Sequence, residues 1–406
     1  MSGRAVVIGG GITGALTALE FMSNGWSVVV VEGAHIGAGS SSRTAAGIRQ
    51  QFSTPGTVRG MRYAVQFYRD WAEHTGQAEL PIVQSGYLFL HDDDRRWAAA
   101  RNTVDMQRAS GLDDVAALSP AEVIDRFPWV SCEAIVGGTW CPSDGFLLPD
   151  RIYQDAMNRV RELGGDVRQR AMVAGSRDAG GRLTAVDTGK GMVEGDLFID
   201  CTNAWTNRTA GMMGAEVLPV DPLKRYLWFL LREGSMSADT LATMPLVVAP
   251  SGIYVRPENR DSLMMGKKHD TRPEPQFSYD DQDHIEARYS HKTGIDAVPF
   301  EHWMSISEVL PPLGEFGGIT ATTAGYYGTT PDHNPFLDFD RQIPNLIRLV
   351  GFSGHGAMFG PFSARVCLAL ANAGTPISTM DLYGQPIDLG AFKIGRDFDS
   401  HETMVI

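Results

Sequence analysis

The chain has 406 residues, of which 43% are hydrophobic and 20% are charged, a composition typical of a globular protein with about two or three domains. Its formal net charge of −13 argues against nucleic acid and anionic membrane surfaces as partners. No apolar run reaches the length of about 18 residues that a membrane span needs, and the first expected strand begins close to Met1. We therefore expect no membrane span, no targeting segment and a cytoplasmic location. The four cysteines lack metal-ligand spacing, which predicts reduced thiols and no metal site.

Residues 5–32 carry the clearest pattern of the chain. A short apolar run at 6–8 predicts a buried strand, and Gly9, Gly11 and Gly14 follow it in the order G-x-G-x-x-G. These glycines allow a tight turn, a close approach of the backbone to a pyrophosphate, and close packing of the next helix on the strand. That helix is expected at 12–24 and a second strand at 26–31. Glu32 then stands where a carboxylate binds the ribose of a dinucleotide, so the segment predicts dinucleotide binding.

The remaining elements alternate along the chain without an internal repeat or a low-complexity linker. Apolar spacing predicts helices over 57–75, 95–110, 150–163 and 361–373, and Ser119 with Glu122 predicts a helix start with a capping box. Strands are expected over 166–173, 182–188, 192–199, 223–231, 246–256 and 346–351, with a loop of small residues over 352–360. The predicted fold class is α/β plus α+β, a Rossmann-like domain interleaved with a domain built on an antiparallel sheet.

Three further segments, taken with the N-terminal unit, resemble the D-amino-acid oxidase superfamily. They are the glycine–serine loop at 37–42, Pro-Asp-His-Asn-Pro at 331–335 and Gly-Phe-Ser-Gly-His-Gly at 351–356. Within the superfamily the chain is similar to the branch of sarcosine oxidase, dimethylglycine dehydrogenase and glycine oxidase-like enzymes. The resemblance implies FAD, and the second glycine-rich loop independently favours a ligand held along a greater length than NAD. We divide the chain into an FAD-binding domain over 1–50, 140–215 and 325–406 and a substrate-binding domain over 51–139 and 216–324.

The same resemblance implies which residues hold FAD, from its pyrophosphate and ribose to its adenine and flavin ends. The expected contacts are Gly9, Gly11, Ile12, Thr13, Gly14, Glu32, Ser41, Ser42, Arg43, Thr44, Val173, Thr202, Asn203, Trp205, Gly354, His355, Gly356, Ala357 and Met358.

The groups that attach FAD covalently in these relatives are missing from the matching positions. Thr44 precedes Ala-Ala-Gly, where the dehydrogenase relatives carry a histidine. Gly325 stands seven residues before Asp332, where the monomeric sarcosine oxidases carry a cysteine. We therefore predict that FAD is held non-covalently.

Four residues are candidates for the chemistry on the substrate. Arg49 matches an arginine of sarcosine oxidases and would clamp a substrate carboxylate; the alternative is a structural ion pair. His355, between two glycines, would polarise the ring or accept a proton, or else serve packing. Tyr254 and Arg256 share one face of an alternating strand, which would either cover the flavin or lie at the surface. Weaker candidates of the same kind are Tyr326, Tyr327, Lys268 and His269.

The resemblance implies oxidation of a C–N bond in an amine or amino acid, with O₂ or another molecule as electron acceptor. Two lysines of sarcosine oxidases are replaced here, one by Met358 and the oxygen-activating one by Met264 or Met265. Oxidase and dehydrogenase activity both stay open at this point. Two other functions are alternatives: oxidation of a 2-hydroxy acid on the same fold, and a flavin-binding subunit without turnover of its own.

Overall fold

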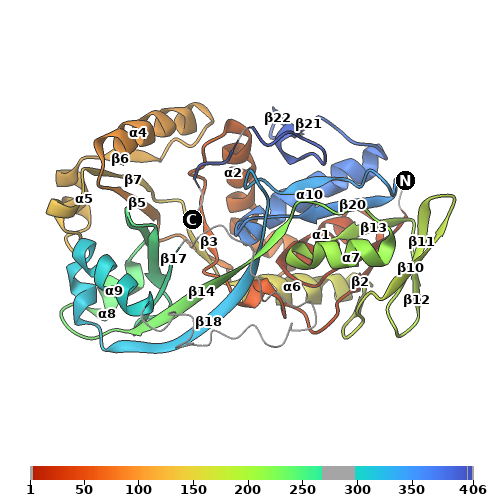
Figure 1. Ribbon diagram of the computed structural model, residues 1–406, viewed down its shortest axis with the longest axis horizontal. Helices are drawn as coiled ribbons and strands as arrows, with labels where there is room; N and C mark the ends of the chain where they lie inside the picture. Colours follow the sequence, from red (N-terminus) through yellow and green to blue (C-terminus); the bar gives the residue numbers. More distant parts are fainter. Residues whose placement is uncertain (1–2, 268–297, 400, 405–406) are drawn as a thin grey trace.

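The computed structural model describes residues 3–267, 298–399 and 401–404 of the chain. One half is built on a six-stranded sheet in the order β19-β20-β13-β1-β2-β9 (Figure 1). Its strands are parallel except for β19, which pairs antiparallel with β20. They span Arg4–Ile8 (β1), Ser27–Val31 (β2), Asp166–Arg168 (β9), Leu197–Asp200 (β13), Phe336–Phe339 (β19) and Leu346–Val350 (β20).

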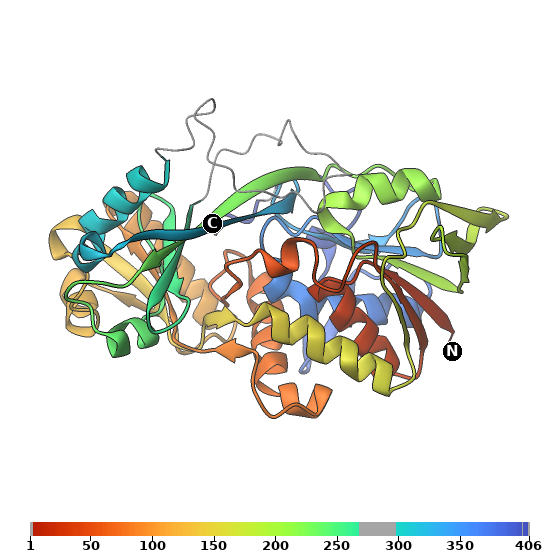
Figure 2. The same cartoon turned by 90° about the horizontal axis from the view of Figure 1, so that it is seen from below.

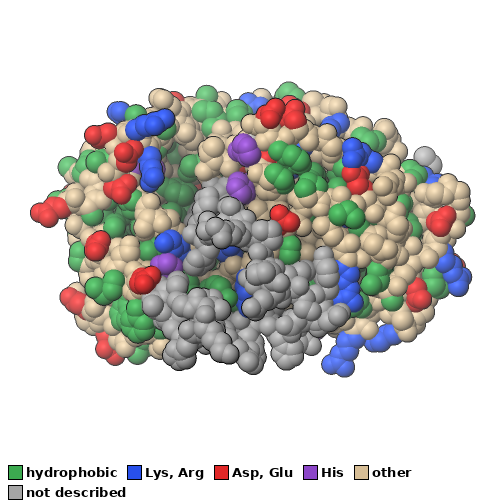
Figure 3. All heavy atoms as spheres, in the orientation of Figure 1, with side chains coloured by type: hydrophobic (Ala, Val, Ile, Leu, Met, Phe, Trp, Pro, Cys, Tyr) green, Lys and Arg blue, Asp and Glu red, His purple; other side chains and the backbone are tan. Residues whose placement is uncertain are grey.

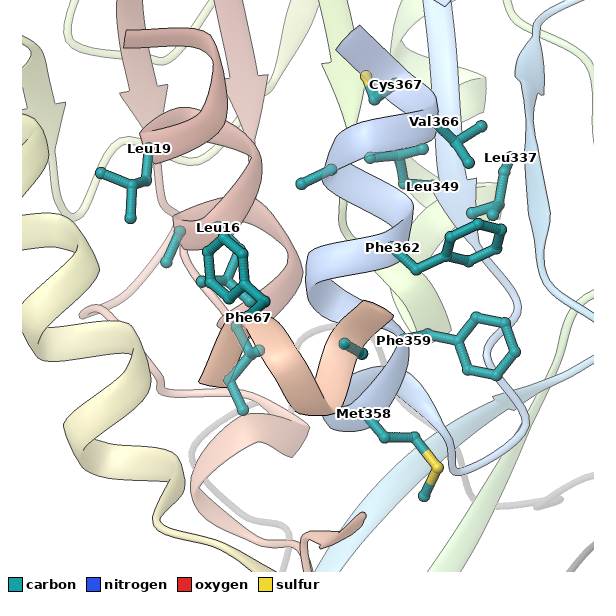
Figure 4. Packing of buried hydrophobic residues seen from close by; sticks show 14 of the residues in the cluster. Leu16, Leu19, Phe67, Leu337, Leu349, Met358, Phe359, Phe362, Val366 and Cys367 are labelled. Carbon is teal, nitrogen blue, oxygen red and sulfur yellow. The ribbon is translucent and has the colours of Figure 1, made fainter. Parts of the chain in front are cut away.

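Helices cover one face of this sheet, and a small sheet with one helix covers the other. On the first face pack α1 (Ile12–Ser23), α2 (Pro55–Arg69), α6 (Pro149–Glu162) and α10 (Gly356–Ala373), whose buried side chains form one apolar cluster (Figure 4). On the second lie α7 (Thr206–Met213) and the antiparallel strands β10 (Gly175–Ala179), β11 (Arg182–Asp187) and β12 (Met192–Glu194). Successive residues of β1 and β2 enter opposite clusters, which explains why both strands are continuously apolar.

The other half is built on an eight-stranded sheet in the order β18-β14-β17-β16-β15-β5-β7-β6. The strands span Tyr87–His91 (β5), Ala116–Leu118 (β6), Gly137–Cys141 (β7), Asp221–Leu231 (β14), Leu246–Val248 (β15), Ile253–Pro257 (β16), Ser262–Lys267 (β17) and Gly318–Thr329 (β18). The long strands β14 and β18 run from this half toward the six-stranded sheet (Figures 1 and 2).

The two faces of the eight-stranded sheet differ in what covers them. One packs on α5 (Pro120–Arg126), α8 (Ala238–Thr243) and α9 (Val298–Val309) in a closed apolar cluster. The opposite face, called the inner face below, carries Tyr87, Phe89, Leu227, Leu246, Val248, Tyr254 and Met264, which cluster with Ala45 of the six-stranded half. Of the two methionines aligned with the oxygen-activating lysine, Met264 thus lies on the inner face and Met265 on the outer one.

The remaining elements are short or peripheral. They are α3 (Trp71–Thr75), α4 (Asp94–Ala109), β3 (Gly47–Ile48), β4 (Ile82–Val83), β8 (Gly145–Leu147), β21 (Thr379–Leu382) and β22 (Gln385–Asp388). Strands β3, β8 and β4 form a small sheet between the halves. Acidic and basic side chains are interspersed over the face shown in Figure 3. In the described part of the chain, no helix combines the length and apolar character needed to cross a membrane.

Five expected elements differ in the structure. The helix expected at 57–75 is divided at Asp70 into α2 and α3. The strand expected at 166–173 ends at Arg168. The strand expected at 246–256 is a hairpin of β15 and β16, because Pro250 and the positive φ of Gly252 (79°) turn the chain back. The strand expected at 192–199 is two strands in different sheets, interrupted at Gly195. The loop expected at 352–360 ends early, because α10 begins at Gly356. The capping box of Ser119 and Glu122 is confirmed.

Pro361 explains the misplaced start of α10. A proline inside a helix leaves the carbonyl four residues earlier without its usual donor, so the sequence pattern favours a helix that begins at the proline. Here that carbonyl, on Ala357, accepts a hydrogen bond of 2.7 Å from the Tyr68 hydroxyl. A distant residue of α2 thereby allows the helix to begin one turn before the proline.

Candidate functional site

A pocket with about 1310 Å³ of space, open mouth included, lies at the carboxyl ends of β1, β2 and β13. Of the predicted cofactor contacts, the following line it: Gly9, Gly11, Ile12, Thr13, Glu32, Ser41, Arg43, Thr44, Val173, Thr202, Asn203, Trp205, Gly354, Gly356 and Ala357. Segments from both ends of the chain thus meet in one elongated site, as the paired glycine-rich patterns predict.

The glycine turn between β1 and α1 has no room for side chains. Gly9 has a φ of 107°, and a Cβ there would lie 3.0 Å from the carbonyl oxygen of Cys201. A Cβ on Gly14 would lie 1.9 Å from the carbonyl oxygen of Gly9. The missing side chain of Gly14 therefore allows α1 to pack close to β1. Gly14 lies against the backbone of the turn and does not line the pocket.

Glu32 fixes the turn from the end of β2. Its two carboxylate oxygens accept hydrogen bonds of 2.7 Å from the backbone N–H of Gly10 and of Ala34. Burial raises the pKa of the Glu32 carboxyl, and these two N–H groups oppose that rise. The carboxylate lines the pocket while it holds the backbone around it.

The loop at 40–45 crosses the pocket beside α1. The Ser41 hydroxyl accepts a 3.0 Å hydrogen bond from the backbone N–H of Ile12, at the start of α1. Arg43 donates to the carbonyls of Ala38 and Gly39, so its side chain braces the loop. Ser42 is exposed and does not line the pocket, and its hydroxyl lies 3.5 Å from the carbonyl oxygen of Gly39.

The turn after β13 connects the pocket to the second glycine-rich loop. The Asn203 side-chain oxygen accepts from the backbone N–H groups of Gly351 (3.0 Å) and Phe352 (3.2 Å). Asp200 supports the same turn, since its carboxylate accepts from the N–H (2.9 Å) and the hydroxyl (2.6 Å) of Thr202. The two bonds of Asn203 join residues that lie about 150 positions apart in sequence, as expected where parallel strands end side by side.

Arg49 is enclosed on all sides. It has no exposed surface, and its guanidinium carbon lies 4.0 Å from the ring centre of Phe52. Its terminal nitrogens donate to the carbonyls of Gln51 and Met404, and one lies 3.3 Å from His355 Nε2. Burial lowers the pKa of Arg49. Arg49 therefore holds the segment at 401–404 in this structure. The sequence predicts that a substrate carboxylate can reach Arg49, but its side chain is not accessible.

His355 and Met358 lie next to the pocket without lining it. His355 precedes α10 and is buried against Phe52, at 5.3 Å between ring centres, and against Phe359. Met358 is buried in the cluster of α1, α2 and α10, because one helical position separates it from the pocket-lining Ala357 (Figure 4). The expected flavin contacts of this helix are thus reduced to Gly356 and Ala357.

Tyr254 and Arg256 lie on one face of β16, as the alternation predicts, but have different surroundings. Arg256 donates to the carbonyls of Ala45 (2.7 Å) and Pro257 (2.6 Å) and forms a 3.0 Å ion pair with Glu258. It therefore ties β16 to the loop that crosses the pocket. The Tyr254 hydroxyl lies beside that of Tyr327, which lines the pocket.

A family model described as FAD dependent oxidoreductase matches residues 4–370. The chain belongs to this family. It is 26% identical over 434 residues to the bovine (Bos taurus) FAD-dependent oxidoreductase domain-containing protein 1, covering 96% of this chain and 84% of that protein. It is 24% identical to mouse (Mus musculus) mitochondrial sarcosine dehydrogenase, over 88% of this chain and 38% of that longer protein. Among solved structures, L-proline dehydrogenase from P. horikoshii has a TM-score of 0.80 and 26% identity, over 92% of this chain and 94% of that one.

This FAD-dependent oxidoreductase has a pocket whose residues fit the cofactor. The Gly9–Gly14 turn leaves backbone without side chains at the pocket wall, Glu32 offers a carboxylate at one end, and the start of α10 stands at the other. A helix start favours negative charge, which suits the electron-rich edge of a reduced flavin. Thr44 and Gly325, the positions compared above for covalent attachment, both line the pocket.

Sequence reasoning missed part of the pocket wall. Arg208, Ala171 and Met172 line it, and Tyr326 and Tyr327 line it although they were ranked only as weak candidates. Arg208 follows Trp205 by three positions in the turn that leads into α7, and helical spacing could have identified it. The place of Tyr327 in the pocket wall could not be predicted, because it depends on the register of β18 against β14. Lys268 and His269 lie outside the described residues.

Proposed function

We propose that this FAD-dependent oxidoreductase oxidises the C–N bond of an amine or amino acid. FAD, when bound, supplies the acceptor for a hydride from the carbon next to nitrogen. The substrate leaves as an imine, which water hydrolyses to a carbonyl compound and an amine. The single observation that carries the proposal is the junction of the pocket with the inner face: Tyr327 lines the pocket, and its hydroxyl lies beside that of Tyr254 on that face. Relatives named sarcosine dehydrogenase and L-proline dehydrogenase support an amine as substrate.

Different lining residues would contact different parts of FAD. Gly11, Ile12 and Thr13 would hold the pyrophosphate and Glu32 the adenosine ribose. Val173 would lie beside the adenine, and Ser41, Arg43 and Thr44 would lie along the phosphates. Thr202 and Trp205 would cover the cofactor from the turn after β13, and Gly354 and Gly356 would contact the flavin.

Around the flavin end, the protein would supply orientation and electrostatics. The inner face would exclude water from the reacting carbon, since Tyr87, Phe89 and Met264 are all buried. Arg49 would act through His355, which it holds at the start of α10. In this role Arg49 is a positioning residue, and Arg256 positions the loop at Ala45.

An anaerobic flavin-reduction screen tests the proposal. The FAD-loaded protein is mixed with N-methyl amino acids, D- and L-amino acids, proline and 2-hydroxy acids, and bleaching of the flavin absorbance is followed. We expect reduction by at least one amine and none by hydroxy acids. Reduction by hydroxy acids alone would replace the proposal with C–OH oxidation, and a flavin inert to every compound would indicate a subunit without turnover. Admitting air afterwards decides between O₂ and another electron acceptor.

A further inference from the structure

The segment at 401–404 lies against the inner face, close to the flavin end of the pocket. The Met404 side chain packs with the apolar cluster of that face. Its carbonyl accepts a hydrogen bond from a terminal nitrogen of Arg49, and the same nitrogen lies 3.3 Å from His355 Nε2. His355 directly precedes Gly356, which lines the pocket. Met404 therefore contacts the inner face with its side chain and is joined through Arg49 to the start of α10.

A buried carboxylate holds this segment in place. Glu402 is 2% exposed, and its carboxylate accepts hydrogen bonds from the N–H (3.0 Å) and the hydroxyl (2.6 Å) of Ser53 and from the N–H of Met404 (2.9 Å). The backbone N–H of Thr403 donates to the Ser53 hydroxyl at 3.1 Å, and that of Glu402 donates to the carbonyl of Asp332 at 3.1 Å. Hydrogen bonds to a carboxylate are stronger than those between neutral groups. The backbone of Met404 is thus fixed, which gives its side chain a defined place on the inner face.

The surface that surrounds Met404 is apolar. Of the side chains that the structure describes, those of Ala45 and Met404 join the inner-face cluster from outside the eight-stranded sheet. Alanine offers a single methyl group, whereas methionine has a long unbranched side chain that fills irregular space. The nearby guanidinium of Arg49 is fully enclosed, and its carbon lies 5.6 Å from the ring centre of Phe89. A polar group directed at this surface would lose its hydrogen bonds to water without replacement, so the surface favours an apolar group.

We infer that Met404 is a specificity residue, which limits the length of the apolar substituent that a substrate can place on the inner face. This inference rests on the proposed function and narrows it: the substrate is an amine that carries an apolar substituent. The substituent would pack on the inner face next to the flavin end of the pocket, and its far end would meet Met404. A longer substituent would have to displace a side chain whose backbone is held by Arg49 and Glu402.

The length limit can be measured without turnover. The FAD-loaded protein is titrated with n-alkylamines, from methylamine to octylamine, while the visible flavin spectrum is recorded. Each methylene that is buried on the apolar surface should lower the Kd about fourfold, until the chain reaches Met404 and the Kd stops falling. Met404→Ala removes the side chain beyond Cβ, so the Kd should continue to fall for about three further carbons. Met404→Leu keeps a side chain of similar volume and should retain the limit of the unchanged protein.

A methionine far from the inner face provides the matched control. Met380 is half-buried on the peripheral hairpin of β21 and β22, and Met380→Ala should leave the length limit unchanged. All variants should retain the FAD content of the unchanged protein. The same limit in Met404→Ala and the unchanged protein, or the same shift in Met380→Ala, would overturn the inference. So would the absence of any effect of the alkylamines on the flavin spectrum.

A turnover readout separates this inference from the proposed function. For amines that reduce the flavin, Met404→Ala should raise kcat/KM for a longer substituent relative to a shorter one, by about fourfold for each additional carbon. If an amine reduces the flavin and this preference is the same in both proteins, the inference fails while the proposed oxidation stands. If the alkylamines bind with a limit that shifts in Met404→Ala but no amine reduces the flavin, the proposed oxidation fails while the role of Met404 in binding stands.

Discussion

Arg348 offers the sharpest test of how the fold supports the cofactor pocket. It is fully buried between two carboxylates, with Nε 3.0 Å from Asp200 and a terminal nitrogen 2.9 Å from Asp340. Replacing it with methionine leaves both carboxylates buried without their cation, a change that costs about 3–5 kcal/mol. Asp200 also accepts from Thr202, so the loss should reach the pocket. We expect the FAD Kd of Arg348→Met to rise about tenfold, which corresponds to about 1.4 kcal/mol.

The assay is urea unfolding of the FAD-loaded protein at pH 7, with FAD affinity measured by fluorescence. Arg341→Met is the matched control, because Arg341 pairs with Glu216 on the same side of the sheet while its own side chain is 60% exposed. That exposed pair should contribute at most about 1 kcal/mol. Arg348→Lys keeps a charge without bridging both partners and should lie between the two, which preserves the test if the methionine variant fails to fold. Equal losses for Arg348→Met and Arg341→Met would refute the reasoning.

Three other predictions concern the cofactor and a buried carboxylate. Acid precipitation should release free FAD, since Thr44 and Gly325 offer no attachment; flavin that stays with the precipitate would contradict this. Glu32→Ala should weaken FAD binding about tenfold or more, because the loss of this acceptor leaves two backbone N–H groups unpaired, and equilibrium dialysis measures the change. Burial raises the pKa of Asp144 to about 6, so the native state binds its proton more tightly than the unfolded chain. The free energy of unfolding should therefore fall by up to about 3 kcal/mol as the pH rises from about 4 to 6, and Asp144→Asn should remove that part of the pH dependence in denaturant titrations.

The sequence predicts the β1-α1-β2 unit closely, because every signal in it is local. Apolar runs mark the strands, Gly9 and Gly14 mark the turn, and α1 ends one residue before the expected position. The start of α10 could not be predicted in the same way. It depends on the Tyr68 hydroxyl, which satisfies the carbonyl that Pro361 leaves open, and no local pattern connects these residues.

The same distinction applies to the candidate site. The glycine-rich patterns identify the pocket because a backbone without side chains is a property of residue type. The surroundings of Arg49 depend on a contact with Met404 across 355 positions, and those of Arg225 depend on the register of β14 against β18. Residue type alone made Arg49 either a clamp for a carboxylate or a partner in an ion pair; only its neighbours in the structure distinguish these roles.

The cations near the inner face differ in how their charges are balanced. Arg49 lies close to the carboxylates of Asp144 and Glu402, and Arg256 pairs with Glu258, so both cations are balanced locally. Among the described residues, no carboxylate forms an ion pair with Arg225, and the hydroxyls of Tyr254 and Tyr327 lie beside it. The chain as a whole carries −13 and repels an anionic substrate at long range, but salt screens that field over about 8–10 Å. Within a partly desolvated site the nearest charge dominates, since an interaction is several times stronger there than in bulk water.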